Sequence, residues 1–234
     1  MDQRPAETWL AFVENCAWYR NLPHDLRSLV RQTASEKTAA AGDTIARTGE
    51  PCTHWYGLMR GVLQMYVVGS DGTDGTETTL YCLREGEWGG EGSLLKDEPR
   101  RYDLRALTPS RLCMLPRQTF DTLRGASIEF NHFLCDLMNA RMGVFVGMLA
   151  ASRLQGPEMQ VAKGLMMLVD FDGPDEQELA VSQHDLALIC GLSRQRVNMA
   201  ISVFKRRDIV RSQPNRSTLV VRVDRLRGFV TAEN

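Results

Sequence analysis

One short stretch of the chain carries side chains suited to reading the edges of DNA bases. Residues 194–198 read Arg-Gln-Arg-Val-Asn. The guanidinium fork of arginine suits the two major-groove acceptors of guanine, and the amides of Gln and Asn suit adenine. Such side chains read bases where the end of a helix carries them into the major groove. The stretch therefore predicts the start of a DNA-recognition helix.

The residues around this stretch have the pattern of two short helices joined by a tight turn. Ser182 is a typical helix N-cap, and Asp185 completes an acidic variant of the capping box. Gly191 can adopt a positive φ and so end the first helix, and Ser193 can cap the second. Any two amphipathic helices around a glycine share this pattern, so the flanking sequence must support a DNA-binding interpretation. The apolar residues at helical spacing are Leu186, Leu188, Ile189, Val197, Ala200, Ile201 and Phe204.

The segment that follows is basic, although the whole chain is nearly neutral with 28 Lys and Arg against 29 Asp and Glu. Its only acids up to residue 227 are Asp208 and Asp224. Such a local excess of positive charge is typical of a phosphate-binding surface. Residues 209–212 and 217–222 predict a two-stranded wing with Arg216 at its tip. The basic residues are Arg194, Arg196, Lys205, Arg206, Arg207, Arg211, Arg216, Arg222, Arg225 and Arg227.

We predict two sets of DNA contacts in this region. One set is expected to read base edges: Arg194, Gln195, Arg196 and Asn198. The other surrounds the helix starts and the wing, and is expected to hold phosphates and set the register on the duplex. It comprises Ser182, Gln183, His184, Ser193, Arg216, Ser217 and Thr218.

The middle of the chain has the pattern of a closed all-β unit. From about Glu36 to about residue 115, short apolar runs alternate with glycines, which is typical of a barrel or jelly roll. Residues 69–75 predict a loop. A helix over 6–19 and a short helical piece beginning at 22–26 are expected to precede this unit. The six cysteines are scattered without zinc spacing, which favours buried hydrophobes, with a redox role as the alternative.

A long helix is predicted from Ser127 to about Leu154, followed by a break at Gly156-Pro157. Its apolar residues recur at intervals of three and four, close to a heptad seam. Packing on its own barrel would use only part of this apolar surface, so we expect two copies to pair along it. A further helix over 158–170 and an acidic loop over 172–178 then lead to the helix-turn-helix. The expected interface residues are Leu134, Met138, Arg141, Met142, Phe145, Met148 and Leu149.

The order of these elements resembles that of the cyclic-AMP receptor protein and fumarate-nitrate regulator (CRP/FNR) family, over about 26–222. Gly49, Gly61, Gly86 and Gly90-Glu91 lie at the family's spacings, apart from a few extra residues in the 69–75 loop. Gly90-Glu91-Gly92-Ser93-Leu94-Leu95, with Pro99-Arg100, looks like the family's phosphate-binding cassette. The run Gly-Leu-Ser-Arg-Gln-Arg-Val-Asn at 191–198 looks like its recognition helix.

The resemblance implies an α+β chain in three parts. These are a cyclic-nucleotide-binding-like β jelly roll with N-terminal helices (1–126), a dimerisation helix (127–155) and a winged helix-turn-helix (156–234). It implies a sequence-specific transcription regulator and not an enzyme, working as a homodimer on double-stranded DNA and with RNA polymerase. We expect it in the cytoplasm and not in a membrane, because no apolar run approaches a bilayer span and the start lacks a signal peptide.

The resemblance also implies where a small-molecule effector binds. In cyclic-nucleotide-binding members a cassette glutamate holds the ribose hydroxyl and an arginine holds the phosphate, and Glu91 and Arg100 fit those places. The next place, a Ser or Thr in such members, is Arg101 here. Phe145 and Val146 stand where such members present hydroxyls to adenine. We therefore expect an unidentified effector other than cyclic AMP, such as a small aromatic or acyl anion, bound by Gly90, Glu91, Arg100, Arg101, Tyr102, Met142, Phe145 and Val146.

Several alternatives remain open at this point. The effector could be a cyclic nucleotide after all, or the regulator could be constitutive or redox-tuned. A haem sensor would need an axial ligand, for which His24, His54, His132 and Cys82 are formally available. An iron–sulfur sensor would need clustered N-terminal cysteines, and Cys16 stands alone there. A cupin-like metal enzyme is the remote alternative, since no His-x-His occurs, and a cyclic-nucleotide-binding adaptor is disfavoured by the basic C-terminus.

Overall fold

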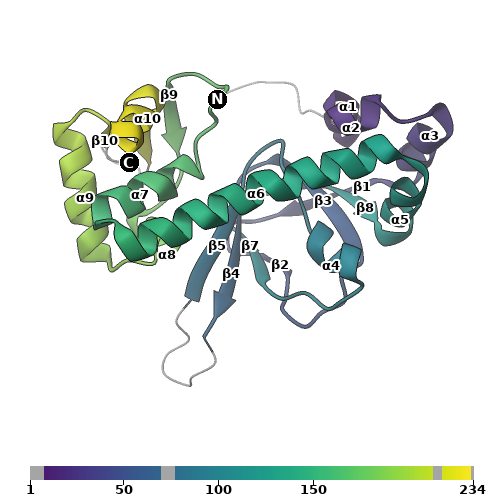
Figure 1. Cartoon of the computed structure of the whole chain (residues 1–234), viewed down its shortest axis with the longest axis horizontal. Coiled ribbons are helices and arrows are strands. Elements are labelled where there is room, and N and C mark those ends of the chain that lie inside the picture. The colour runs from purple at the N-terminus through teal and green to yellow at the C-terminus, as the bar shows by residue number, and fades with distance from the viewer. Residues whose placement is uncertain (1–7, 70–76, 213–217, 233–234) are drawn as a thin grey trace. The chain divides into compact units, whose positions relative to one another are not determined.

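The computed structural model describes residues 8–69, 77–212 and 218–232. The chain forms two compact units (Figure 1). The first comprises residues 1–63 and 83–142, and the second comprises residues 64–82 and 143–234. These units cut across the three-part division predicted from the sequence, because residues 64–82 group with the C-terminal half.

Three short helices open the first unit: α1 (Trp9–Asn15), α2 (Ala17–Arg20) and α3 (His24–Thr33). The single helix predicted over 6–19 is therefore wrong in one respect, because it is broken at Cys16. The backbone of Cys16 is extended, with φ −70° and ψ 131°, and its N–H caps α1 by donating to the carbonyl oxygen of Val13. The side chain of Thr8 caps the other end of α1, accepting from the N–H of Ala11 at 3.2 Å.

The β-rich region predicted from about Glu36 is present. One antiparallel sheet has the order β1-β8-β3-β6, with Ser35 opposite Met114 and His54 opposite Pro116. β2 pairs with β7 in the first unit, and β4 and β5 are neighbouring strands that lie mostly in the second. The strands are β1 (Ser35–Ala39), β2 (Thr44–Ala46), β3 (His54–Arg60), β4 (Leu63–Val68), β5 (Glu77–Leu83), β6 (Trp88–Gly89), β7 (Asp103–Ala106) and β8 (Ser110–Pro116).

An aromatic core holds the helices of the first unit against this sheet. Trp55 and Trp88 stack with ring centroids 4.1 Å apart, and Trp18 meets Trp88 edge to face at 5.2 Å. Gly57 lies directly beneath this cluster, where an added Cβ would stand 2.8 Å from the Trp88 ring. Glycine at this position therefore allows the strand to approach the tryptophans closely.

Two further helices contribute to the same core. The sequence predicts a short helix over 120–124, and the structure extends it at both ends as α5 (Arg117–Ala126), on which Phe120 is fully buried. α6 (Ile128–Leu154) begins after Ser127, whose hydroxyl accepts from the N–H of Phe130 at 3.1 Å. The predicted start and end of the long helix are thus confirmed.

α6 is long and apolar enough, by length and composition alone, to cross a membrane. The expectation that no stretch reaches such a length is therefore corrected. A single helix of this kind does not by itself indicate a membrane span, because core helices of soluble proteins meet the same criterion. Several of its large apolar side chains are exposed in the single chain: Ile128, Met138, Met142, Val146, Leu149 and Leu154.

The second unit contains the predicted helix-turn-helix and wing strands, with additions. The wing sheet has three strands in the order β10-β11-β9, because part of the predicted acidic loop forms the strand β9 against β11. The helix predicted over 158–170 ends earlier, and the C-terminal helix α10 was not predicted. The elements are α7 (Pro157–Met166), β9 (Glu176–Leu179), α8 (Gln183–Cys190), α9 (Arg194–Arg206), β10 (Val210–Ser212), β11 (Leu219–Arg222) and α10 (Val223–Ala232).

Candidate DNA interface and effector cassette

Local capping bonds position the two helices of the helix-turn-helix. The hydroxyl of Ser182 accepts from the N–H of Asp185 at 3.1 Å, and the Asp185 carboxylate accepts from the N–H of Ser182 at the same distance. The predicted capping box is therefore confirmed. At the other end of α8, Gly191 has φ +62°, and the next N–H, of Leu192, donates to the carbonyl oxygen of Ala187 at 3.0 Å.

The second helix presents the predicted base-reading residues to solvent. Ser193 caps α9 by accepting from the N–H of Arg196 at 3.3 Å. The apolar residues Val197, Ala200, Ile201 and Phe204 are all buried, as predicted. The side chains left exposed at the start of the helix include Arg194, Gln195, Arg196 and Asn198. The helix thus offers donors and acceptors to a duplex from one face while the other face anchors it.

The residues predicted to contact phosphates differ in their exposure and in the hydrogen bonds that they already make. Gln183 and His184 are exposed at the start of α8, and Arg194 donates to Nδ1 of His184 at 3.2 Å. The hydroxyl and N–H of Ser182 both donate to Asp185, so binding a phosphate would compete with the capping box. Oγ1 of Thr218 is buried and has no hydrogen-bond partner among the described residues. Arg216 and Ser217 lie outside the described residues.

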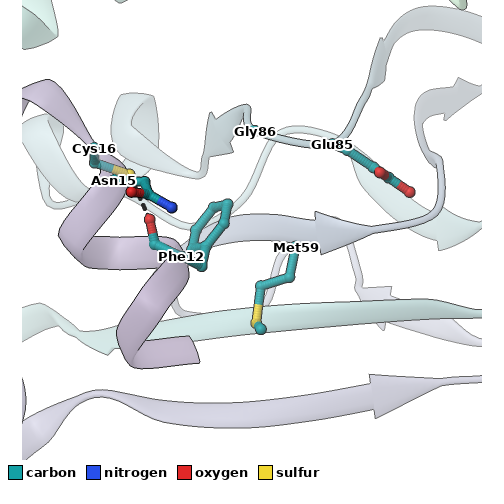
Figure 2. A pocket seen from close by; sticks show the side chains of 6 residues that line it. All are labelled: Phe12, Asn15, Cys16, Met59, Glu85 and Gly86. Carbon is teal, nitrogen blue, oxygen red and sulfur yellow. Dashed lines mark hydrogen bonds between the residues drawn. The ribbon is translucent and has the colours of Figure 1, made fainter. Parts of the chain in front are cut away.

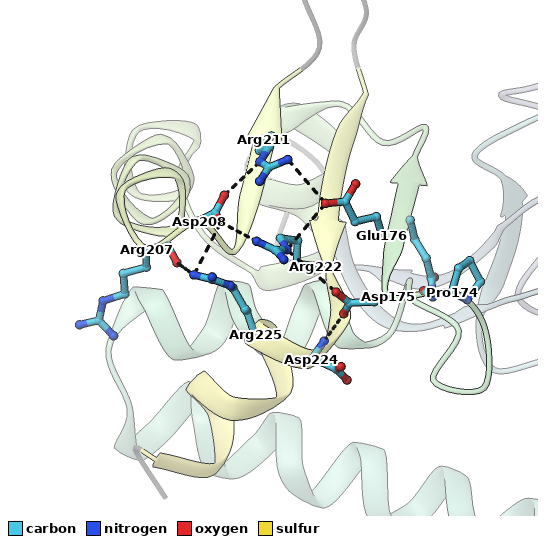
Figure 3. Close-up of polar contacts among 10 residues, drawn as sticks. Pro174, Asp175, Glu176, Arg207, Asp208, Arg211, Arg222, Asp224 and Arg225 are labelled. Carbon is cyan, nitrogen blue, oxygen red and sulfur yellow. Dashed lines mark hydrogen bonds and ion pairs between the residues drawn. The ribbon is translucent and has the colours of Figure 1, made fainter.

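The basic tail contains an ion-pair network that the sequence alone did not reveal (Figure 3). Its centre is Asp208, which accepts from Arg222 Nη1 at 2.6 Å and from Arg211 Nε at 3.0 Å. Arg225 lies 3.6 Å from the same carboxylate. The hydrogen bond from Arg211 is the largest cause that holds the pKa of Asp208 below its usual value.

Acids from the preceding segment complete this network. Glu176 in β9 lies 3.5 Å from Arg211 and 3.7 Å from Arg222, and Asp175 accepts from the N–H of Asp224 at 2.8 Å. Three arginines counted toward the phosphate-binding surface are therefore paired within the protein. Lys205 and Arg206, which are exposed near the end of α9, remain the better candidates for phosphate contact.

In the first unit, the cassette residues form a buried polar site around Tyr56. Gly90 has φ +96°, and a Cβ there would lie 2.9 Å from the Tyr56 ring. Glu91 opens α4 (Glu91–Lys96), and its carboxylate pairs with Arg141 of α6. Nη2 of Arg141 also donates to the carbonyl oxygen of Trp88 at 2.7 Å. Arg141 is therefore buried within its own chain, in contrast to its predicted place on the dimer seam.

Arg100 is the second buried charge of the cassette. Its guanidinium lies 5.5 Å from the centre of the Tyr56 ring, and Nη1 donates to the Tyr56 hydroxyl at 3.4 Å. Burial raises the pKa of Tyr56, while the Arg100 charge lowers it and the Glu91 charge raises it, so both charges act on one phenol. Oε2 of Glu91 is buried without a hydrogen-bond partner in the described part of the chain. The site thus holds a buried cation and an unsatisfied acceptor.

The other predicted effector residues are less buried. Arg101 is exposed and donates to Glu98 at 2.7 Å. Its guanidinium is therefore paired with a carboxylate instead of being held ready for an anionic effector. Tyr102 is half-buried, and desolvation raises its pKa well above the usual value. Met142 and Val146 are both 59 % exposed. Phe145 belongs to the second unit, where it meets Tyr81 edge to face at 6.1 Å.

A pocket of about 320 Å³ opens elsewhere in the first unit, between α1 and the strands around Met59 (Figure 2). It contains none of the predicted effector residues and no cationic side chain, so an anion would lack a charged partner there. No local sequence pattern indicates this pocket, because it forms where the N-terminal helix packs against the rest of the unit. Its lining consists of Phe12, Asn15, Cys16, Met59, Glu85 and Gly86.

The groups considered for metal or redox chemistry are dispersed. Among the described residues, no group of three or more His, Cys, Asp and Glu side chains could hold a metal ion. Burial raises the pKa of Cys113 and of Cys190 to about 12, which makes both poor thiolates at neutral pH. Cys52 and Cys82 are also buried, whereas Cys135 is exposed. The interpretation of most cysteines as buried hydrophobes is confirmed.

Comparison with known proteins identifies both halves of the chain. Residues 36–126 match the model of the cyclic nucleotide-binding domain, and residues 160–229 match that of the Crp-like helix-turn-helix domain. The chain belongs to the CRP/FNR family of transcription regulators. It is a DNA-binding regulator with a cyclic-nucleotide-binding domain, and proteins of this family are generally not enzymes.

Individual relatives agree with this assignment. The chain is 26 % identical over 190 residues to a CRP-like cAMP-activated global transcriptional regulator of Mycobacterium tuberculosis, covering 79 % of this chain and 83 % of that one. Its fold is similar to that of FixK2 from Bradyrhizobium japonicum, with TM-score 0.71 and 17 % identity over 84 % of this chain and 96 % of that one. A CRP/FNR regulator from Eubacterium rectale gives TM-score 0.68 with 16 % identity, covering 92 % and 98 %.

Two contacts of α6 were not predicted from the sequence. The pairing of Arg141 with Glu91 joins residues 50 positions apart, and no local pattern indicates it. Leu134, predicted at the dimer seam, instead packs into the aromatic core of its own unit. The sequence does contain a sign of this packing. Leu134 follows Phe130 by one helical turn, so both side chains lie on the same face of the helix.

Proposed function

We propose that this CRP/FNR regulator works as a homodimer whose affinity for DNA is set by an effector in the cassette. The exposed apolar side chains of α6 support pairing between two copies, since Met138, Met142 and Leu149 recur along the helix and are 38 %, 59 % and 54 % exposed. The dimer would present two recognition helices to successive major grooves about 34 Å apart. RNA polymerase and double-stranded DNA are the partners, and the cytoplasm is the compartment.

The three-part division remains our functional proposal. Residues 1–126 bind the effector, residues 127–155 pair the two copies, and residues 156–234 bind DNA. The effector shifts the population between dimer geometries, of which only one matches the spacing of the two grooves. Because Arg141 lies on α6 and pairs with Glu91 in the cassette, a ligand that competes for Glu91 acts directly on the dimerisation helix.

The buried charges of the cassette define the effector's chemistry. Arg100 suits an anionic group, and the unsatisfied Oε2 of Glu91 suits a donor such as a hydroxyl. We propose an anion other than cyclic AMP, because Phe145 and Val146 offer no donor at the positions where the family presents hydroxyls to adenine. The observation that carries this proposal is the burial of Arg100 in a site without a carboxylate bonded to it among the described residues.

A cyclic nucleotide is the second candidate, because its ribose hydroxyl would satisfy Oε2 of Glu91. The relative from Mycobacterium tuberculosis is described as cAMP-activated. In that case Arg101 must leave Glu98 and substitute for the hydroxyl residue that the family pattern places there.

A thermal-shift titration with cyclic AMP, cyclic GMP and a panel of small aromatic and acyl acids separates these candidates. A ligand of the native state raises the melting temperature with concentration. We expect an acid from the panel to do so, and Arg100→Gln to abolish the effect, while Lys96→Gln at the exposed end of α4 preserves it. Stabilisation by cyclic AMP that is lost in Arg101→Ala would favour the second candidate. No response to any compound would contradict effector control of this kind.

Sedimentation tests the dimer independently of the effector. Leu149→Glu places a charge in the proposed seam and should yield monomers at concentrations where the wild type is dimeric. Val68→Glu, at a large exposed apolar residue on β4, is the matched control and should leave the dimer intact. A monomeric wild type would contradict the proposal.

A further inference from the structure

One apolar side chain stands among the polar residues of the recognition helix. Met199 on α9 is 63 % exposed. Among the described residues after Gly156, it is the only large hydrophobic side chain left exposed. A single exposed apolar residue is ordinary on a protein surface, so its neighbours must show whether it has a role.

The neighbours of Met199 are the residues that face a duplex. One helical turn before it stand Gln195 and Arg196, and one turn after it stands Ser202, all exposed. The hydroxyl of Ser202 donates to the carbonyl oxygen of Asn198 at 2.8 Å, so that side chain folds back on the helix and leaves the surface around Met199 open. The buried face of the helix, which includes Val197 and Ala200, points the other way. Met199 therefore lies on the face that carries the base-reading groups.

The chemistry of the major groove offers one apolar partner to such a side chain. Each base pair presents donors and acceptors there, and an A·T pair also presents the C5-methyl group of thymine. A thioether pressed against donors and acceptors leaves them without hydrogen bonds, whereas against a methyl group it removes apolar surface from water. The flexible Met side chain can adapt to the position of that methyl group.

We infer that Met199 reads the C5-methyl group of a thymine in each half-site, beside the bases contacted by Gln195 and Arg196. The specificity of this regulator thus includes an apolar contact in addition to the hydrogen bonds predicted from the sequence. The inference rests on DNA binding by the helix-turn-helix and needs no particular effector.

Replacing thymine by uracil tests the contact at the level of one methyl group. Operators are first selected from a random duplex library, and duplexes are then made with deoxyuridine at each thymine in turn. Wild-type protein should lose about fourfold in affinity at one thymine per half-site, as expected for one buried methyl group, and little at the others. Met199→Ala should bind thymine and uracil duplexes equally, and Met199→Leu should retain the preference.

Lys205→Ala serves as the control on the same helix. It should weaken binding to all duplexes while keeping the thymine preference, because it removes a charge and no apolar contact. Equal binding of wild-type protein to thymine and uracil at every position would overturn the inference. A uracil penalty that persists in Met199→Ala would also overturn it, because another group would then contact the methyl. Failure to select any duplex would overturn it together with the DNA-binding function.

Discussion

The recognition helix and the effector cassette handle their charged residues in opposite ways. On α9, Arg194 and Arg196 stand exposed on a helix whose other face is anchored in the core. In the cassette, Glu91 and Arg100 are buried, and each already contacts a group of the same chain. A surface that must meet a large, rigid duplex can leave its donors in water, whereas a site for a small ligand has to bury them. Arg141 compensates the charge of Glu91, whereas Arg100 donates to the neutral hydroxyl of Tyr56, so its charge stays available to an anionic ligand.

The largest expected effect concerns the ion pair of the cassette. Arg141→Met leaves the buried carboxylate of Glu91 without its partner and should destabilise the first unit by about 3–5 kcal/mol. Urea denaturation followed by tryptophan fluorescence measures it, because Trp88 contacts Arg141. The double variant Arg141→Met with Glu91→Gln should recover much of the loss. If Arg141→Met is as stable as wild type, the buried charges of the cassette do not depend on internal partners, and the contrast with the exposed charges of α9 is lost.

A smaller effect is expected at the recognition helix, on binding instead of stability. Arg194→Ala should cost about 1–3 kcal/mol in binding to a selected operator and relax specificity at one base position. Its side chain is exposed, so the melting temperature should stay close to wild type. Fluorescence anisotropy with matched and mismatched duplexes measures the change. Unchanged affinity for the operator would mean that the helix is not placed in the groove as proposed.

The cap of the recognition helix should have a more modest effect. Ser193→Ala removes the acceptor of the Arg196 N–H and should destabilise the second unit by about 1 kcal/mol. Ser193→Gly should cost less, because glycine is tolerated at an N-cap. Thermal unfolding of the three proteins gives the order. Equal stability of all three would show that tertiary packing alone holds the helix start.

The smallest effect is expected from Asp208 in the ion-pair network below the wing. The pKa of this carboxyl is lowered by Arg211 first and by Arg222 as well, so its contribution to stability is present above the usual aspartate pKa. That contribution is lost as the pH falls through the lowered, folded-state value. Asp208→Asn, which suits the positive φ of 55°, should flatten the acid side of the pH–stability curve. An unchanged curve would show that solvent screens the network.

Local patterns were enough to predict the helix-turn-helix and not enough to predict the cassette. The capping roles of Ser182 and Ser193, the turn at Gly191 and the long helix α6 all rest on neighbouring residues, and the structure agrees with them. The pairing of Arg141 with Glu91 depends on how distant segments fold together. For the same reason the sequence predicts more unpaired arginines in the basic tail than the structure contains. The acids Asp175 and Glu176, which pair with that tail, lie outside the basic segment in the sequence.

Two elements of the second unit were also not predicted from the sequence. The β9 segment was predicted to be part of a loop. Three of its four side chains are polar, so it lacks the alternation of apolar and polar residues that indicates a strand. α10 was missed although its buried residues Val223, Leu226, Phe229 and Val230 recur at helical spacing. The sequence does not separate Met199 from the core of α9, because an apolar residue between Val197 and Ala200 resembles a core residue; in the structure its side chain is 63 % exposed.

The most direct test compares the affinity of the full-length protein for a selected operator with its affinity for a scrambled duplex, over a range of salt concentrations. The account predicts that the operator binds at least about 1,000-fold more tightly at physiological salt. Both affinities should fall as salt rises, because phosphate contacts contribute to each. Equal affinity for the two duplexes would contradict sequence-specific regulation through α9 and leave the basic residues with only a non-specific role.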